Sequence, residues 1–188
     1  MDKYGCHGHI CGIKCSVVVN CGEFPHLESN TPCLSVSLSQ ALTLYMFIGE
    51  YSHNLDEKGR LAIPKKFRAD LSQGAVVTRG LDSCLFLYTK EEWSKLAEKL
   101  AQLPFSQANS RAFARLMLAG AMDVEVDTQG RIMLPPYLRT FAGLGKSVVV
   151  AGLYTRLEIW DEAKWKSYTT SSESESTAIA EQMGNLGV

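Results

Sequence analysis

The chain has 188 residues, a formal net charge of −1, 46% hydrophobic residues and 21% charged residues. This length allows one domain or two small modules, and the composition is typical of a soluble globular protein rather than a disordered one. The longest purely apolar runs, such as 148–151, are far shorter than the roughly 20 residues that a membrane helix needs, so no membrane span is expected. Because the net charge is near zero, nucleic-acid binding would require a local basic patch.

The first 45 residues differ from the rest because they contain five of the six cysteines. They show no helix or strand periodicity and no secretory signal, so we expect a disordered leader or sequence upstream of a start at Met46. The zinc-type ligands in this segment are Cys6, His7, His9, Cys11, Cys15 and Cys21. Their spacing matches none of the standard finger patterns, so the sequence favours the absence of a metal site.

A duplication organises the chain from Met46 onward. The run 56–64 recurs at 127–135, an offset of 71 residues, and after one inserted residue the matches continue at an offset of 72 to Trp93 and Trp165. Two copies indicate two paired modules, because an open solenoid needs at least three repeats to bury a continuous core.

Each copy is predicted to be rich in β-strands. In the second copy Met122, Val124 and Val126 alternate with acidic residues, and Ile132 and Leu134 alternate after the motif, which predicts two half-buried strands around a tight turn. The motif Asp-x-x-Gly suits a hairpin turn, because the aspartate accepts backbone N–H bonds and the glycine allows a positive φ. A further strand pair is expected in each copy, at 76–77 with 85–88 and at 148–150 with 157–160.

The connection between the copies is predicted to be helical. Thr89 and Glu92 have the spacing of a capping box and begin a helix that runs to about Pro104, and a second helix is expected over about 106–119. The run of serine and glutamate at 171–176 predicts a mobile tail without a site. The expected organisation is a leader at 1–45, a first module at 50–95, a helical connection at 96–120, a second module at 121–166 and a mobile tail at 169–188.

The arginine after each turn glycine is the most informative residue for function. Arg60 and Arg131 could contact a phosphate or a guanine edge, or could pair with the aspartate four positions earlier, and spacing alone leaves both roles open. The first copy is the more basic, with a balance of +3 over 56–68 against +1 over 127–139. A weakly basic monomer binds DNA weakly, so an oligomer that presents several copies of the patch is expected.

The sequence does not indicate an enzyme. His53 and Cys84 are the only histidine and cysteine after residue 45, and no third group orients them in a known motif, which favours structural roles for both. The run 143–147 lacks the spacing of a phosphate-binding loop. We therefore expect no catalytic residue, no cofactor and no small-molecule substrate.

Together these motifs resemble the MraZ family of bacterial transcriptional regulators. The resemblance rests on the duplicated Asp-x-x-Gly-Arg, on Met46-Phe47-x-Gly49, on Leu116-x-Leu118-x-Gly120 and on Leu157-x-Ile159-Trp160. It implies a mainly β fold with helices, of class α+β, in which two tandem AbrB-like swapped-hairpin modules form a small pseudo-twofold β-barrel with a helical connection. The cysteine-rich leader is a departure from this family.

The resemblance also implies a function and a site. It implies a ring oligomer that binds tandem repeats in double-stranded DNA upstream of the division and cell-wall gene cluster, in the cytoplasm on the nucleoid. The expected DNA-binding residues are Lys58, Arg60, Lys65, Lys66, Arg68 and Arg131. The expected turn-shaping residues are Asp56, Gly59, Asp127 and Gly130. The alternative, suggested by the near-neutral charge, is a non-DNA oligomeric scaffold or an antitoxin-like protein-interaction module.

Overall fold

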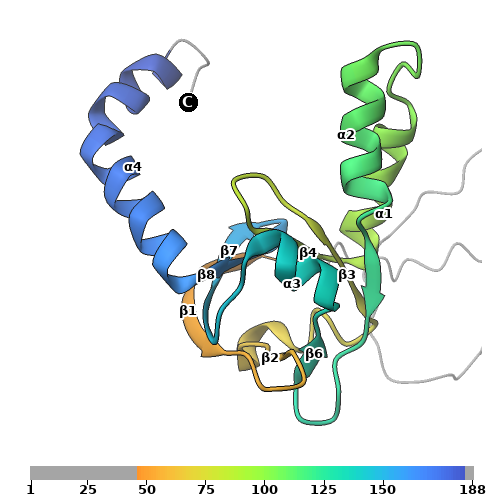
Figure 1. Cartoon of the computed structure of the whole chain (residues 1–188), viewed down its shortest axis with the longest axis vertical. Helices are drawn as coiled ribbons and strands as arrows, with labels where there is room; N and C mark the ends of the chain where they lie inside the picture. The colour runs from red at the N-terminus through yellow and green to blue at the C-terminus, as the bar shows by residue number, and fades with distance from the viewer. Residues whose placement is uncertain (1–45, 185–188) are drawn as a thin grey trace, which may run out of the picture. The chain divides into compact units, whose positions relative to one another are not determined.

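The computed structural model describes residues 46–184, which have a mixed α+β fold with antiparallel sheets and four α-helices (Figure 1). The cysteine and histidine cluster of the first 45 residues lies outside the described residues. Within the described part of the chain, no helix combines the length and the apolar character needed to cross a membrane.

The two repeats contribute corresponding elements in the same order. The first repeat contains β1 (Phe47–Asn54), β2 (Arg60–Ala62), a 3-10 turn (Lys65–Phe67), β3 (Ala75–Arg79), β4 (Leu85–Thr89), α1 (Lys90–Ala101) and α2 (Ala108–Leu118). The second contains β5 (Met122–Val124), β6 (Arg131–Met133), α3 (Pro136–Ala142), β7 (Ser147–Tyr154), β8 (Arg156–Asp161) and α4 (Glu162–Met183). The predicted strand pairs β3–β4 and β7–β8 and the two connecting helices are confirmed.

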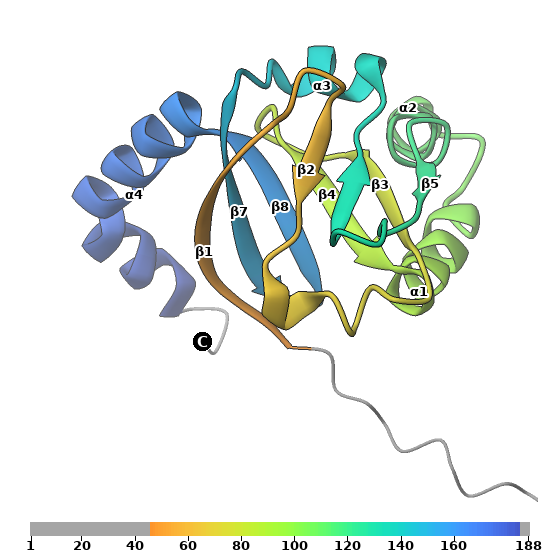
Figure 2. The same ribbon diagram turned by 90° about the horizontal axis from the view of Figure 1, so that it is seen from below.

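Strand pairing relates the repeats by a pseudo-twofold operation. Six strands form a sheet in the order β1-β7-β8-β4-β3-β5, and β2 pairs with β6 in a separate ribbon that crosses one face of the sheet (Figure 2). Exchanging the repeats reverses this order but leaves every neighbour unchanged. Phe86 lies opposite Glu158, and Leu61 lies opposite Ile132. Because both are pairs of equivalent positions in the duplication, they lie on the axis that relates the repeats.

The strands on either side of each motif turn do not pair with each other along their length, as a simple hairpin would. β5 pairs with β3 and β6 pairs with β2, and in the first repeat only a single bridge between Leu55 and Leu61 joins the two sides. The repeats therefore exchange strands. A period of two residues predicts a strand and its buried face. The partner strand is the one whose pairing buries that face, and the period does not identify it.

The main core is shared by both repeats and lies between the ribbon and the sheet. Leu61 and Ile132 from the ribbon pack there with Leu85, Leu87 and other fully buried side chains of the sheet. Because side chains alternate along a strand, Phe86 and Tyr88 of β4 face the other side of the sheet. There they form a second cluster with α1 and α2.

The serine-rich run assigned to the tail is helical in the structure. The Asp161 side chain accepts hydrogen bonds from the backbone N–H groups of Ala163 and Lys164, and α4 continues from there to Met183. None of its residues is buried. Forming the first turn is the costly step of helix formation, and the cap and the packing of the first turn of α4 stabilise that turn. The low-complexity sequence at 171–176 does not show that a helix begins before it.

The exchange of strands predicts that the first repeat does not fold as a monomer. A fragment of residues 46–119 loses the pairs β1–β7, β3–β5, β4–β8 and β2–β6, so we expect no cooperative unfolding transition for the monomeric fragment. Mixing it with a fragment of residues 120–188 should restore the transition of the full chain, measured by circular dichroism. A cooperative transition in the isolated monomeric fragment would contradict the prediction.

Candidate nucleic-acid interface

The first motif turn is held by Asp56. Its Oδ1 accepts hydrogen bonds from the backbone N–H groups of Lys58 at 2.9 Å and Arg60 at 2.8 Å, and its Oδ2 accepts one from Arg60 Nε at 2.6 Å. The Gly59 N–H donates to the Asp56 carbonyl at 2.9 Å, and Gly59 has a φ of +78°. The predicted turn-shaping roles of Asp56 and Gly59 fit this geometry.

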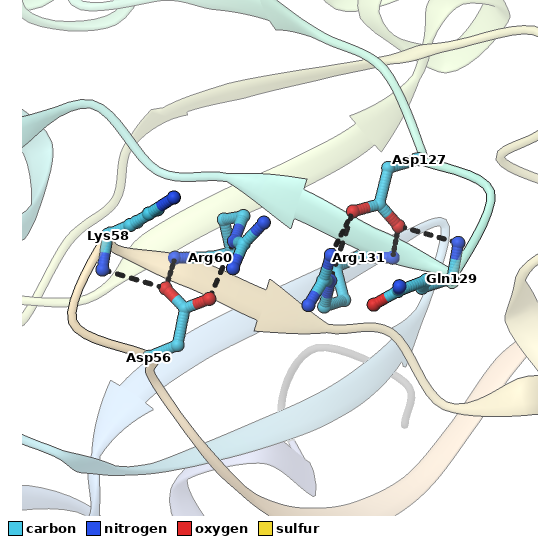
Figure 3. A network of polar contacts seen from close by, with 6 residues as sticks. All are labelled: Asp56, Lys58, Arg60, Asp127, Gln129 and Arg131. Atoms are coloured by element: carbon cyan, nitrogen blue, oxygen red, sulfur yellow. Dashed lines mark hydrogen bonds and ion pairs between the residues drawn. The ribbon is translucent and has the colours of Figure 1, made fainter.

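The second turn repeats the first (Figure 3). Asp127 Oδ1 accepts from the backbone N–H groups of Gln129 and Arg131 at 2.9 Å, and its Oδ2 accepts from Arg131 Nε at 3.0 Å and Nη2 at 2.9 Å. Gly130 has a φ of +77°. In both turns the backbone N–H of the arginine is the largest of the causes that lower the pKa of the aspartate.

Each motif arginine pairs with its own aspartate, one of the two roles that the sequence left open. The pairing does not enclose the guanidinium, because the side chains of Arg60 and Arg131 are 30% and 25% exposed. Arg60 uses its Nε for Asp56, and its Nη atoms make no hydrogen bond within residues 46–184. The side chain is therefore oriented by Asp56 and still has donors for a further acceptor.

The ribbon places both arginines on one face. Leu61 and Ile132 point into the core and are fully buried, and side chains alternate along a strand. Arg60 and Arg131, the residues just before them, therefore lie on the outer face of the ribbon. The two turns lie at opposite ends of this ribbon (Figure 3).

Arg68, predicted to contact DNA, joins its repeat to the second turn. Its Nε donates to the Ile63 carbonyl at 2.8 Å, and its guanidinium lies so close to Gly130 that a Cβ there would overlap it. The Ile63 N–H donates to the Gly130 carbonyl at 2.9 Å. Arg68 thus packs against the turn of the other repeat.

Arg139 makes the equivalent contacts with the first turn. Its Nε donates to the Leu134 carbonyl at 3.1 Å, and a Cβ at Gly59 would lie 2.7 Å from its Cζ. The Leu134 N–H donates to the Gly59 carbonyl at 2.9 Å. Arg139 is the equivalent of Arg68 at the offset of 71 residues, but the sequence predicts no role for it, because nothing in the spacing indicates a contact with a turn 80 residues earlier.

The predicted lysines differ in their surroundings. Lys58 and Lys65 are exposed, and their side chains make no ion pair or hydrogen bond within the described residues. Lys66 instead donates to the Ile48 carbonyl, and its Nζ lies 4.7 Å from the centre of the Phe67 ring. The Lys66 ammonium group is therefore held against β1 and Phe67 of its own repeat.

Lys146 is a basic residue at this site that the sequence reasoning missed. It is exposed, and it lines a hollow beside the first turn together with Asp56, Lys58 and Arg60. Its carbonyl accepts a hydrogen bond from the Leu55 N–H at 2.8 Å. It lies in the glycine-containing run 143–147, whose spacing gives no sign of a contact with a turn far earlier in the chain.

His53 and Cys84 do not form a reactive pair. His53 lies on β1 and Cys84 directly before β4, and these strands are separated by two others, a distance of roughly 14 Å across the sheet. Burial lowers the pKa of His53, with Arg68 as the second cause, and burial raises the pKa of the Cys84 thiol to about 12. Within residues 46–184 no group of three or more histidine, cysteine or acidic residues is placed to hold a metal ion.

Comparison with known proteins identifies two tandem matches to one family. The family model described as "MraZ protein, putative antitoxin-like" matches residues 46–116 and 117–186. A transcriptional regulator MraZ of Acetivibrio thermocellus is 51% identical over 143 residues, which cover 76% of this chain and 100% of that protein. Proteins of the same name from Syntrophomonas wolfei and Halothermothrix orenii are 46% and 49% identical with the same coverage.

The turn glycines lead to a prediction about stability. Gly59→Ala and Gly130→Ala would each place a Cβ against an arginine of the other repeat at a positive φ, so we expect each to lower the free energy of unfolding by about 1–3 kcal/mol. Gly184→Ala is the control, because no atom lies within 4 Å of its added Cβ. Urea denaturation measures the difference, and equal midpoints for all three variants would refute the prediction.

The turn aspartates lead to a prediction about pH. Because folding lowers the pKa of Asp56 and Asp127, their contribution to stability is present above the unfolded pKa, near 4, and is lost as the pH falls through the lower folded pKa. We expect Asp56→Asn/Asp127→Asn to lower the melting temperature at pH 7 and to flatten its fall below about pH 4. Glu57→Gln, an exposed carboxylate in the same turn, is the control; an unchanged acid profile in the double variant would exclude this role.

Proposed function

Since this chain belongs to the MraZ family of transcriptional regulators, we propose that it binds DNA sequence-specifically and regulates transcription of the division and cell-wall gene cluster. The observation that carries this proposal is the β2–β6 ribbon, whose outer face presents Arg60 and Arg131. It acts as a regulator and not as an enzyme.

The ribbon has a shape that DNA can accept. The major groove of B-DNA admits a two-stranded β-ribbon, and an arginine there can donate two hydrogen bonds to a guanine. Asp56 holds the Arg60 side chain through Nε, so less conformational freedom is lost when its Nη atoms bind a base. We assign base reading mainly to Arg60, and a second contact to Arg131.

Exposed lysines near the two motif turns supply the contacts to phosphates. Lys58 and Lys146 line the hollow beside the first turn, and Lys65 lies two residues after Ile63, which is bonded to the second turn. The balance of charge over 56–68 is +3. Neutralising a phosphate releases counterions, so such contacts add affinity without sequence preference. Lys66 and Arg68 contact the Ile48 carbonyl and the second turn, respectively, and these contacts suit them to positioning β1 and the second turn.

The proposal includes the finer architecture of the repeats. We propose that they are AbrB-like swapped-hairpin modules that together close a small pseudo-twofold β-barrel. The exchange of strands between repeats supports this, as does a core that packs between the ribbon and the six-stranded sheet. The barrel would hold the two motif turns at a fixed separation, at the ends of one ribbon.

We further propose that the chain assembles into a ring that binds tandem repeats in DNA, in the cytoplasm on the nucleoid. The balance of charge is only +3 over 56–68 and +1 over 127–139, so the affinity of one chain for a single site is small. A ring that presents several turns converts binding at the second site into an intramolecular event, which raises affinity without any new contact.

Binding to promoter DNA of the division and cell-wall gene cluster tests this proposal. With the full chain, Arg60→Ala should weaken binding by about 1–3 kcal/mol and relax base preference, whereas Lys58→Ala should weaken binding to all sequences and reduce the salt slope by about 1. Lys99→Ala on α1, far from the turns, is the matched control. Fluorescence anisotropy at two salt concentrations measures all four proteins.

The same titration separates the alternatives. If Arg60→Ala and Lys58→Ala bind promoter DNA with unchanged affinity and salt slope, direct reading by the first turn is wrong. If the unaltered chain prefers promoter DNA to a scrambled duplex by no measurable factor, the alternative of a non-DNA scaffold or antitoxin-like module is favoured.

A further inference from the structure

The two motif turns carry different side chains at one equivalent position. The residue before the turn glycine is Lys58 in the first repeat and Gln129 in the second. Both are exposed, and the backbone N–H of each donates to its own turn aspartate at 2.9 Å. Figure 3 shows them at opposite ends of the ribbon, with Arg60 and Arg131 between them. The duplication therefore holds a lysine and a glutamine in the same backbone setting.

The Gln129 side chain is free to bind a partner outside the chain. A carboxamide can donate two hydrogen bonds and accept two, and that of Gln129 makes none within residues 46–184. Only the Gln129 backbone takes part in the turn. In Figure 3 the side chain extends from the second turn toward Arg131. Gln129 therefore presents an unused donor and acceptor beside an arginine that lies on the outer face of the ribbon.

The arginine of the second turn is less free than that of the first. Arg131 gives Asp127 two of its donors, Nε at 3.0 Å and Nη2 at 2.9 Å, whereas Arg60 gives Asp56 only Nε. An arginine that reads a guanine donates two hydrogen bonds to it. Arg60 keeps both Nη atoms for this purpose, whereas Arg131 keeps only Nη1 without a partner in the described part of the chain. Base reading at the second turn therefore depends more on another side chain.

The charge around the second turn favours base reading over phosphate binding. The balance is +1 over 127–139, against +3 over 56–68. Lys146, which lines the hollow beside the first turn, has no basic counterpart, because the equivalent residue at the offset of 72 is Gly74. A neutral carboxamide adds no charge to attract a phosphate. It does match the neighbouring acceptor and donor that adenine presents in the major groove.

We propose that Gln129 identifies an adenine at the second-turn end of the DNA site. Its Nε2 donates to adenine N7, and its Oε1 accepts from the adenine N6 amino group. This inference rests on the proposed binding of DNA by the ribbon. Arg60 and Arg131 stand two pairing positions apart, roughly 7 Å or about two base pairs. Gln129 lies beyond Arg131, so its A·T pair lies outside those that the arginines contact.

The test uses the full chain and tandem-repeat promoter duplexes of the division and cell-wall gene cluster. Each position of the repeat is changed to the other three base pairs, with the same change in every repeat, and affinity is measured by fluorescence anisotropy. The unaltered chain should prefer A·T at one outer position by at least about 5-fold. Gln129→Ala should abolish this preference and leave the other positions unchanged. Gln102→Ala, an exposed glutamine at the end of α1, is the matched control and should keep it.

Two further variants change the chemistry of the same position. Gln129→Glu keeps the shape but cannot donate to adenine N7, so it should also lose the A·T preference. Gln129→Lys copies the first turn. It should prefer G·C at the same position, because lysine donates to guanine O6 and N7. Its affinity should also fall more steeply with salt, by about 1 in the slope for each added phosphate contact.

The outcomes separate this inference from the proposed function. If Gln129→Ala keeps every base preference of the unaltered chain, or if Gln129→Lys changes the preferred base at no position, the role of Gln129 is wrong and the regulator stands. If the unaltered chain does not distinguish promoter DNA from a scrambled duplex, the proposed function fails and this inference fails with it. If Gln129→Ala removes the A·T preference while Arg60→Ala changes nothing, Gln129 reads DNA and the role proposed for Arg60 is wrong.

Discussion

The structure depends on a reciprocal contact between the two repeats. Each motif turn is shaped by its own aspartate, and each turn glycine is packed against the arginine of the other repeat, Arg139 on Gly59 and Arg68 on Gly130. A backbone hydrogen bond of 2.9 Å accompanies each contact. The turn glycine is therefore required for two reasons, its positive φ and the absence of a Cβ. Neither turn is complete without the other repeat, which fixes the spacing of the ribbon's two ends.

The sequence was sufficient to predict most of the strands, the two connecting helices and the chemistry of the turns, because these are local. It did not predict α3, and it predicted a mobile tail where α4 continues. Period-two alternation identified the strands, Thr89 identified a helix start, and Asp56 with Gly59 identified a turn. It was not sufficient to predict which strands pair, because an alternating pattern does not identify the partner strand. For the same reason the roles of Arg139 and Lys146 were missed, since each acts on a turn far away in the chain.

Because both repeats lie in one chain, equivalent positions of the two repeats can carry different residues, which the subunits of a homodimer cannot. On the pseudo-twofold axis, Phe86 of one repeat faces Glu158 of the other. Arg156 pairs with Glu158 at 2.9 Å and lies 4.6 Å from the Phe86 ring centre, and the Trp160 indole N–H donates to the same carboxylate. In a symmetric dimer of either repeat, two phenylalanines or two buried glutamates would meet there. Two buried carboxylates without separate partners would be strongly unfavourable.

The same asymmetry extends to the charges and to the helices. The first repeat carries a charge balance of +3 over 56–68 and the helix α2 that covers α1, whereas the second carries +1 over 127–139 and α4, none of whose residues is buried. A molecule with two identical halves would present two copies of each feature, so the duplication gives the two sides of this chain different surfaces. Figure 1 shows the motif turns at one end of the fold and α1, α2 and α4 at the other. The outer face of the ribbon is therefore not covered by these three helices.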